Sequence, residues 1–530
     1  MIGTIELLLG LVLAVAGLAL LARKLQIAYP IPLVIGGLLL GFFPGLPVLR
    51  LDPDLVFILF LPPLLYTAAF FTPWRDFHAN IAPILRLAIG LVLFSTVAVA
   101  WFAHQFMGFP LAAAFVLGAI NSPPDAVAAT AITQGLRVPR WIVTVLDGES
   151  LVNDAASLTT YRFAVVATVT GAFSLAEASV RFVIAVTGGI IVGLLMGWLA
   201  SSVQRRLDDP PVQTTLSLLT PYITYLAAER IHFSGVLAVV IAGLYVGWRA
   251  PEVLTARMRL VAYAVWSMVV FLLNGFIFIL LGLQLPEVVH GISRHSLGGA
   301  VWLAVLVVGL LIAVRFLWFF ASFYIRRAIS RVTRRRSPER SLRHLVLMSW
   351  AGMRGVDSLA AALALPLVTR SGAPFPDRAM IVFLTFSVIL ATLVLQGLTL
   401  SPIIRWLRIV DDSSLEEEER QARLKANQAG LAKLAEVAKL RHVEEGLVGR
   451  LRAEYEDRIQ QLAAPEPGTG PTKLSLYSPE YEKLLREILG VERKTILQLR
   501  NERAINDQVL RRIQRDIDLA EARLQQGEAD

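Results

Sequence analysis

Two carboxylate side chains interrupt long apolar runs of this 530-residue chain. Asp125 follows two prolines in the segment Asn121–Asp125, and Asp154 ends the polar run Gly148–Asp154. An ionisable side chain inside a bilayer is energetically costly, and its default interpretation is functional. Both carboxylates are therefore candidates to bind or move a charged species across a membrane.

Asp154 belongs to a row of oxygen-bearing side chains. In a helix, Ser150, Asp154 and Ser157 fall at positions i, i+4 and i+7, which share one face, and Asn153 lies beside them. Carboxylate and hydroxyl oxygens are hard ligands that suit a hard cation rather than a soft metal. A carboxyl group in a desolvated site can hold a proton or a cation, and the two compete. Mutually exclusive occupancy of Asp154 is sufficient for antiport, provided that only the loaded states change their access between the two sides of the membrane.

Two apolar segments carry helix-breaking residues near their middles. Pro123 and Pro124 remove two backbone donors from one segment, and Trp350–Gly355 places two glycines and an arginine in another. With thirteen spans, these are the fifth and twelfth, which correspond in two six-helix inverted repeats separated by a lone span. Interrupted helices at matching positions indicate a transporter substrate site. The alternative is a proline kink combined with glycine packing.

Other charged residues offer partners for these carboxylates. Glu149 and Arg354 are predicted to form a structural ion pair between the sixth and twelfth spans, although Asp357 could take the same arginine. Arg162, two turns beyond Asp154, is another candidate partner for it. Asp125 has two open interpretations, since it could cap the positive end of a broken helix or contact the ion.

The composition predicts an all-α polytopic membrane protein. Hydrophobic residues make up 55% of the chain, in runs that supply about thirteen spans of roughly 20 residues. Arginines and lysines concentrate in alternate loops, which predicts an outside N-terminus and a cytoplasmic C-terminus. The first apolar run, 5–21, lacks a basic flank and a cleavage site and is predicted to be a span.

Several functional classes are excluded by residue usage. The net charge of +9 comes from arginines that flank the spans, so it does not indicate nucleic-acid binding. The chain has no cysteine, and its seven histidines are scattered without ligand spacing, which argues against thiol chemistry and zinc. No cofactor is expected.

The composition changes after residue 407. Residues 1–407 form the predicted membrane domain, and residues 408–530 are rich in charged and helix-forming residues with near-heptad apolar spacing. Pro465–Pro471 divides this tail, and a second helical pattern runs from Pro479 to Leu524. The tail is interpreted as a cytosolic helical hairpin, with a dimerising or regulatory coiled coil as the alternative.

Four stretches of the membrane domain resemble the monovalent cation/proton antiporters, in particular the electroneutral sodium/proton exchanger branch found in bacteria. Gly148–Asp154 (GESLVND) is similar to the family's Gly-Glu-Ser-Phe-Asn-Asp signature, and Gly352–Gly355 (GMRG) to its Gly-Leu-Arg-Gly stretch. Ser122–Val127 (SPPDAV) resembles its Ser-Pro-Thr-Asp-Pro-Val crossing motif, and Leu61–Tyr66 (LPPLLY) its third-span motif.

The resemblance implies roles for these residues. Asp154 would bind the monovalent cation and the proton, with Ser150 assisting and Asp125 near the site at the crossing of unwound chains. Asn153 would be the neutral neighbour, where the electrogenic branch has a second aspartate, so that one-for-one electroneutral exchange of Na⁺, and also Li⁺, for H⁺ is expected. Glu149 and Arg354 would form the buried pair.

The resemblance also implies an assembly and a location. The protein would be a homodimer in the lipid of the cell membrane, in which a six-helix core moves against a dimerisation domain. Its physiological role would be pH homeostasis. Two positions depart from the family. Pro124 replaces the usual threonine before the crossing aspartate, and Thr67 stands where many members carry an acidic residue, so its hydroxyl is only an accessory candidate.

Competing functions have weaker support. A K⁺/H⁺ antiporter on the same scaffold is the main alternative, because the motifs do not decide the cation. A channel needs no proton-coupled carboxylate or matched broken helices. An intramembrane protease would need a Gly-x-Gly-Asp signature or a histidine partner for Ser150, and neither is apparent, so the chain is not expected to be an enzyme.

Overall fold

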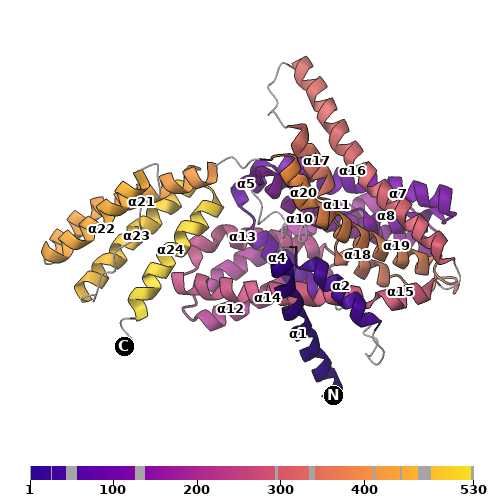
Figure 1. Ribbon diagram of the computed structural model, residues 1–530, viewed down its shortest axis with the longest axis horizontal. Helices are drawn as coiled ribbons and strands as arrows, with labels where there is room; N and C mark the ends of the chain where they lie inside the picture. The colour runs from indigo at the N-terminus through magenta and orange to yellow at the C-terminus, as the bar shows by residue number, and fades with distance from the viewer. Residues whose placement is uncertain are drawn as a thin grey trace.

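The computed structural model describes residues 2–25, 27–42, 56–125, 138–292, 296–333, 341–409, 414–441, 445–463 and 479–526. These residues are almost entirely helical, and their β-pairing is one isolated antiparallel bridge between Val368 and Pro374. A large bundle of apolar helices adjoins a smaller group of polar helices, α21–α24, at one end of the long axis (Figure 1). The predicted all-α polytopic class is confirmed at this level.

The bundle begins with helices that are often short or interrupted. Some of these helices are joined by short π-helical segments. The segments are η1 Val56–Phe60, η2 Arg86–Leu91 and η3 Thr392–Gln396. The first helices of the bundle are α1 Ile2–Leu25, α2 Pro30–Gly41, α4 Leu61–Phe71, α5 Trp74–Ala79, α6 Ile81–Leu85, α7 Val92–Met107, α8 Leu111–Asn121 and α10 Arg140–Thr170.

The second part of the bundle contains most of the long apolar helices. These are α11 Leu175–Gln204, α12 Pro210–Arg230, α13 Gly235–Val253, α14 Ala256–Leu283, α15 Leu285–Gly291, α16 Leu297–Thr333, α17 Leu342–Trp350, α18 Val356–Leu363, α19 Arg378–Ala391 and α20 Gly397–Trp406. By length and composition, six helical stretches of the described residues are able to cross a membrane alone. Three shorter apolar helices accompany them, at Pro30–Gly41, Val56–Phe71 and Leu111–Asn121.

Small residues set the closest helix contacts. Gly189, Gly193 and Gly197 recur at every fourth residue of α11 and face α13. A Cβ added at Gly193 would lie 2.5 Å from the carbonyl oxygen of Ala238, so only glycine permits this approach. Such spacing is typical of membrane helix pairs, in which packing replaces the hydrophobic driving force.

Helix α10 lies between two apolar cores. Its first half contributes Ile142 and Val145 to a core shared with α7, α8, α16 and α19. Further along, Leu151 joins a second core that includes Tyr66 of α4 and Trp266 of α14. The segment that carries Asp154 is therefore held from both sides.

The tail contains four helices where the sequence pattern predicted a hairpin. They are α21 Ser414–Arg441, α22 Glu445–Ala463, α23 Pro479–Asn501 and α24 Asp507–Gln526. The predicted second helical pattern is divided into α23 and α24, whereas the Pro465–Pro471 break lies outside the described residues. Apolar side chains of α21 and α23 pack with α24, which makes the tail a folded unit.

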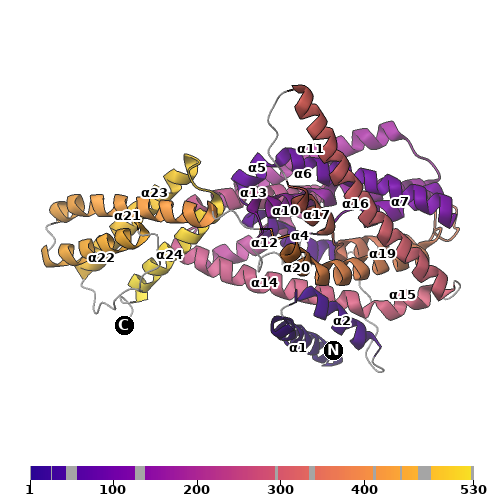
Figure 2. The ribbon, with the colours of Figure 1, turned by 45° about the horizontal axis from the view of Figure 1, so that its top comes forward.

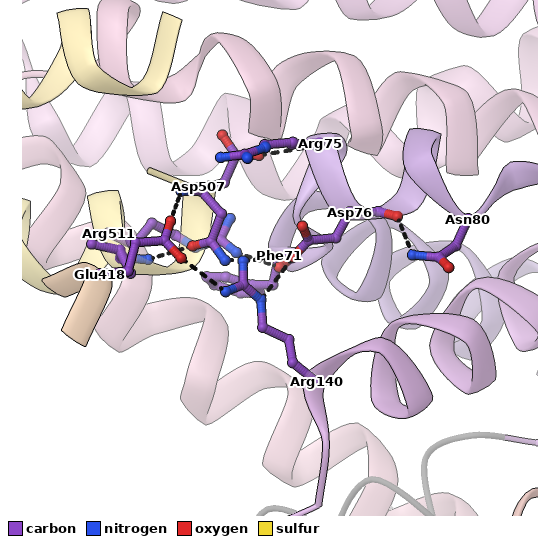
Figure 3. Close-up of polar contacts among 10 residues, drawn as sticks. Phe71, Arg75, Asp76, Asn80, Arg140, Glu418, Asp507 and Arg511 are labelled. Carbon is purple, nitrogen blue, oxygen red and sulfur yellow. Dashed lines mark hydrogen bonds and ion pairs between the residues drawn. The ribbon is translucent and has the colours of Figure 1, made fainter. Parts of the chain in front are cut away.

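The tail is bound to the bundle by charged side chains, including the first residue of α10. Arg140 donates from Nε to Asp76 of α5 over 2.8 Å and lies 3.4 Å from Glu418 of α21 (Figure 3). Arg511 of α24 donates to the carbonyl oxygen of Phe71 at the end of α4 over 2.6 Å. The helix that carries Asp154 therefore begins at a contact with the tail.

Candidate functional site

The two predicted helix interruptions are present and cross each other. Helix α8 ends at Asn121 before the two prolines, and residues 351–355 are non-helical between α17 and α18. The backbone amide of Asp125 donates to the carbonyl oxygen of Met353 over 2.7 Å. A Cβ on Gly355 would lie 2.6 Å from Oδ2 of Asp125, so the crossing requires glycine there. Non-helical backbone at membrane depth is tolerated where protein buries it.

Helix α10 presents its polar face to this crossing. The Asn153 amide donates from Nδ2 to the carbonyl oxygen of Pro124 over 2.7 Å, and Ser157 donates to the carbonyl oxygen of Ala119 over 2.8 Å. Pro124, which lacks the family's hydroxyl, thus still serves as an acceptor. The Asn153 side-chain oxygen is buried and accepts no hydrogen bond from the described residues. Ser150 is partly buried one turn before Asp154.

Asp154 lies beside the crossing with 8% of its surface exposed. None of the basic side chains that the structure describes forms an ion pair with it. Its electrostatic neighbours are instead two other carboxylates, Asp357 in the first turn of α18 and Asp125. Like charges in a desolvated region favour binding of a proton or a cation.

Arg354 stabilises the crossing through backbone groups. Its Nε donates to the carbonyl oxygen of Asn121, the last residue of α8, over 3.1 Å, and its Nη1 donates to that of Gly352. Its own amide donates to Oγ1 of Thr392 over 3.2 Å. A positive charge at the carboxyl end of α8 complements the helix dipole.

The prediction that Glu149 pairs with Arg354 is wrong, because Glu149 pairs with Arg315 instead. Glu149 accepts two hydrogen bonds from Arg315 of α16, at 2.7 Å and 2.8 Å, and both side chains are buried. Arg315 also donates from Nε to the carbonyl oxygen of Met348 over 3.2 Å, which joins α10, α16 and α17. The sequence signal was available, because a lone arginine in a long apolar run requires a counter-ion.

Two accessory candidates are occupied elsewhere. Arg162 pairs with Glu229 at 3.0 Å, and 55% of its side chain is exposed, so the alternative of an Asp154–Arg162 pair is wrong. Thr67 donates its hydroxyl to the carbonyl oxygen of Pro63 over 2.6 Å within α4. With its one donor used, the Thr67 hydroxyl can act only as an acceptor, through its oxygen lone pairs.

Residues 10–406 match the family described as "Sodium/hydrogen exchanger, transmembrane". An uncharacterized Na⁺/H⁺ exchanger of Mycobacterium tuberculosis is 37% identical over 99% of this chain and 98% of its own length. A "Sodium, potassium, lithium and rubidium/H⁺ antiporter" of Bacillus pumilus is 38% identical over 70% of this chain and 57% of its own.

Solved structures share the fold. The sodium proton antiporter MjNhaP1 of Methanocaldococcus jannaschii superposes with a TM-score of 0.57 over 76% of this chain and 99% of its own, at 20% identity. The family match covers most of the helical bundle, including both interruptions and α10. The chain therefore belongs to the sodium/hydrogen exchanger family of integral membrane cation/proton antiporters.

Proposed function

We propose that this protein exchanges a monovalent cation, Na⁺ and also Li⁺, for H⁺ at Asp154. The observation that carries the proposal is a buried carboxylate beside two crossed, interrupted segments, without an ion-pair partner among the described basic side chains. The cation and the proton compete for this carboxylate. Asn153, Ser150 and Asp125 supply further oxygen ligands, and Ser157, Thr67 and Asp357 are accessory groups near the site.

Exchange is proposed to be electroneutral because Asn153 adds no charge beside Asp154. One carboxylate that gives up one proton for each monovalent cation keeps the charge of the site unchanged. The one-for-one stoichiometry then follows if only the loaded states change their access between the two sides of the membrane.

The access change is proposed to be a movement of a six-helix core, which carries α8, α10 and α18, against a dimerisation domain in a homodimer. The matched interruptions support thirteen spans arranged as two inverted six-helix repeats. The loop charges support an outside N-terminus and a cytoplasmic C-terminus in the cell membrane. In this proposal, residues 1–407 transport the ions and serve pH homeostasis, and residues 408–530 regulate this transport from the cytoplasm.

Cation preference has a second candidate. The Bacillus relatives are named for sodium, potassium, lithium and rubidium, which supports K⁺/H⁺ exchange as the alternative. Proteoliposomes with an inside pH dye and an imposed proton gradient distinguish the two when Na⁺, Li⁺, K⁺ or Rb⁺ is added separately. We expect Na⁺ and Li⁺ to dissipate the gradient, with choline as the inert control. A larger response to K⁺ favours the alternative, and no response to any cation contradicts antiport.

A further inference from the structure

A cavity of about 300 Å³ lies between the tail and the bundle and is lined by residues of both. One wall is the first three turns of α14, with the polar side chains of Tyr263 and Ser267, and the opposite wall is α24. Figure 2 shows α24 beside the end of α14 where the tail meets the bundle. The cavity therefore lies where a membrane helix meets the cytosolic unit.

The side chains that line this cavity carry an excess of positive charge. Among its described lining residues, Asp518 is the acid, whereas Arg259, Arg511 and Arg515 are basic. The Asp518 carboxylate is already used, because it pairs with Arg259 and accepts from Arg493 over 2.9 Å. The charges of Arg511 and Arg515 are left without an acid inside the cavity.

Both remaining arginines have donors available. Arg515 is exposed and makes no hydrogen bond or ion pair with any residue that the structure describes. Arg511 donates one hydrogen bond to the carbonyl oxygen of Phe71, which uses only part of its guanidinium. Desolvation lowers the pKa of Arg511 and outweighs the opposing effects of Tyr263, Asp507 and Asp76. An anion bound in the cavity would favour the charged guanidinium of Arg511 and raise its pKa again.

Gln514 provides an independent sign of a missing ligand. Its side chain lines the cavity with 1% of its surface exposed, and neither Nε2 nor Oε1 has a hydrogen-bond partner among the described residues. Buried amide groups are normally hydrogen-bonded, because an unsatisfied donor or acceptor loses its water without compensation. An oxygen-rich anion that accepts a hydrogen bond from Nε2 would satisfy this donor.

We propose that this cavity binds a phosphate group through Arg511, Arg515 and Gln514. Guanidinium groups match phosphate oxygens in geometry and charge, and the cavity holds two of them beside an amide donor. The group has two sources, the head group of an anionic phospholipid or a soluble phosphate. Val261 and Met268 on the exposed face of α14 offer an apolar path for acyl chains in the first case. The site is separate from Asp154.

The test measures the thermal unfolding midpoint of the full-length protein in detergent. One arm adds phosphatidylglycerol, with phosphatidylcholine as its neutral control. The other arm adds inorganic phosphate, with chloride at equal ionic strength as its control. A response to phosphatidylglycerol alone identifies the lipid source, and a response to inorganic phosphate identifies a soluble anion or both. No stabilisation by either compound overturns the proposal.

Matched variants assign the response to the cavity. Arg515→Ala is expected to weaken the apparent affinity about tenfold, the loss of one charged hydrogen bond. Gln514→Leu is expected to fold at least as stably as the parent without added phosphate and to respond less to it. Arg512→Ala removes another exposed arginine of α24, one that pairs with Glu419, so its response should equal that of the parent. An undiminished response in Arg515→Ala contradicts the assignment.

Discussion

Glu149 of α10 and Arg315 of α16 form a buried ion pair with two hydrogen bonds, at 2.7 Å and 2.8 Å. Glu149 lies between one and two turns before Asp154, and the pair fixes α10 to α16. Arg315 also donates to the Met348 carbonyl oxygen of α17, the helix that precedes the second interruption. Removing one partner of such a pair leaves an uncompensated charge in a desolvated environment, which is more damaging than removing both. The pair is thus a structural element of the site.

Arg315→Ala is expected to destabilise the protein by about 3–5 kcal/mol, because Glu149 remains buried without its partner. The double variant Glu149→Leu with Arg315→Met should recover much of that loss. The measurement is thermal unfolding in detergent. Equal stability of Arg315→Ala and the parent would show that the pair does not hold α10.

Gly355→Ala is expected to disrupt the crossing, because the new Cβ would lie 2.6 Å from Oδ2 of Asp125. Overpacking of this kind costs about 1–3 kcal/mol, and we expect transport to fall with it. Gly309→Ala in α16 is the matched control, since a Cβ there meets no atom within 4 Å. Similar behaviour of the two variants in transport and thermal stability would contradict the predicted close approach.

The tail is expected to lose stability as the pH rises. Burial raises the pKa of the Glu492 carboxyl in α23. The folded tail therefore holds this proton more tightly than the unfolded tail. The protonated carboxyl stabilises the folded tail at low pH, and this stabilisation is lost as the pH rises from the ordinary glutamate pKa, about 4.3, through the raised pKa of the folded state. Hydrogen exchange of α23, corrected for intrinsic rates, should show more opening at pH 8 than at pH 5.

Glu492→Gln is the control for that titration, because glutamine has no proton to lose in this range. The difference in corrected exchange between pH 5 and pH 8 should shrink in this variant. If the parent and the variant show the same pH dependence, another group is responsible for the opening of the tail.

Transport is expected to be insensitive to membrane potential, because Asn153 contributes no second charge beside Asp154. The measurement is the initial rate of Na⁺-driven pH change in proteoliposomes clamped at different potentials with K⁺ and valinomycin. Equal rates are predicted at all potentials. A rate that follows the imposed potential would refute one-for-one exchange.

Local sequence patterns were sufficient for some parts of the structure. Paired prolines at 123–124 and the glycines around Arg354 break helices wherever they occur, so both interruptions could be predicted. The polar face of α10 likewise follows from helical spacing, because Asn153 donates to the backbone oxygen of Pro124 after α8, and Ser157 donates to that of Ala119 within α8.

Other parts depend on contacts between distant segments. Arg315 was missed because it stands alone in an apolar helix and Arg354 offered a more obvious counter-charge to Glu149. The docking of the tail was also not predictable, since Glu418 and Asp518 look like ordinary solvated residues until folding places them against Arg140 and Arg259. A charge pattern alone does not specify such partners.

The most direct test of the central claim is cation-driven pH change in proteoliposomes that contain Asp154→Asn. Asparagine keeps the size of the side chain but carries neither a proton to exchange nor a full negative charge for the cation. We predict that exchange is abolished for Na⁺, Li⁺ and K⁺ while the thermal unfolding midpoint confirms a folded protein. Exchange at the parent's rate in this variant would contradict the assignment of Asp154 as the shared site for the cation and the proton.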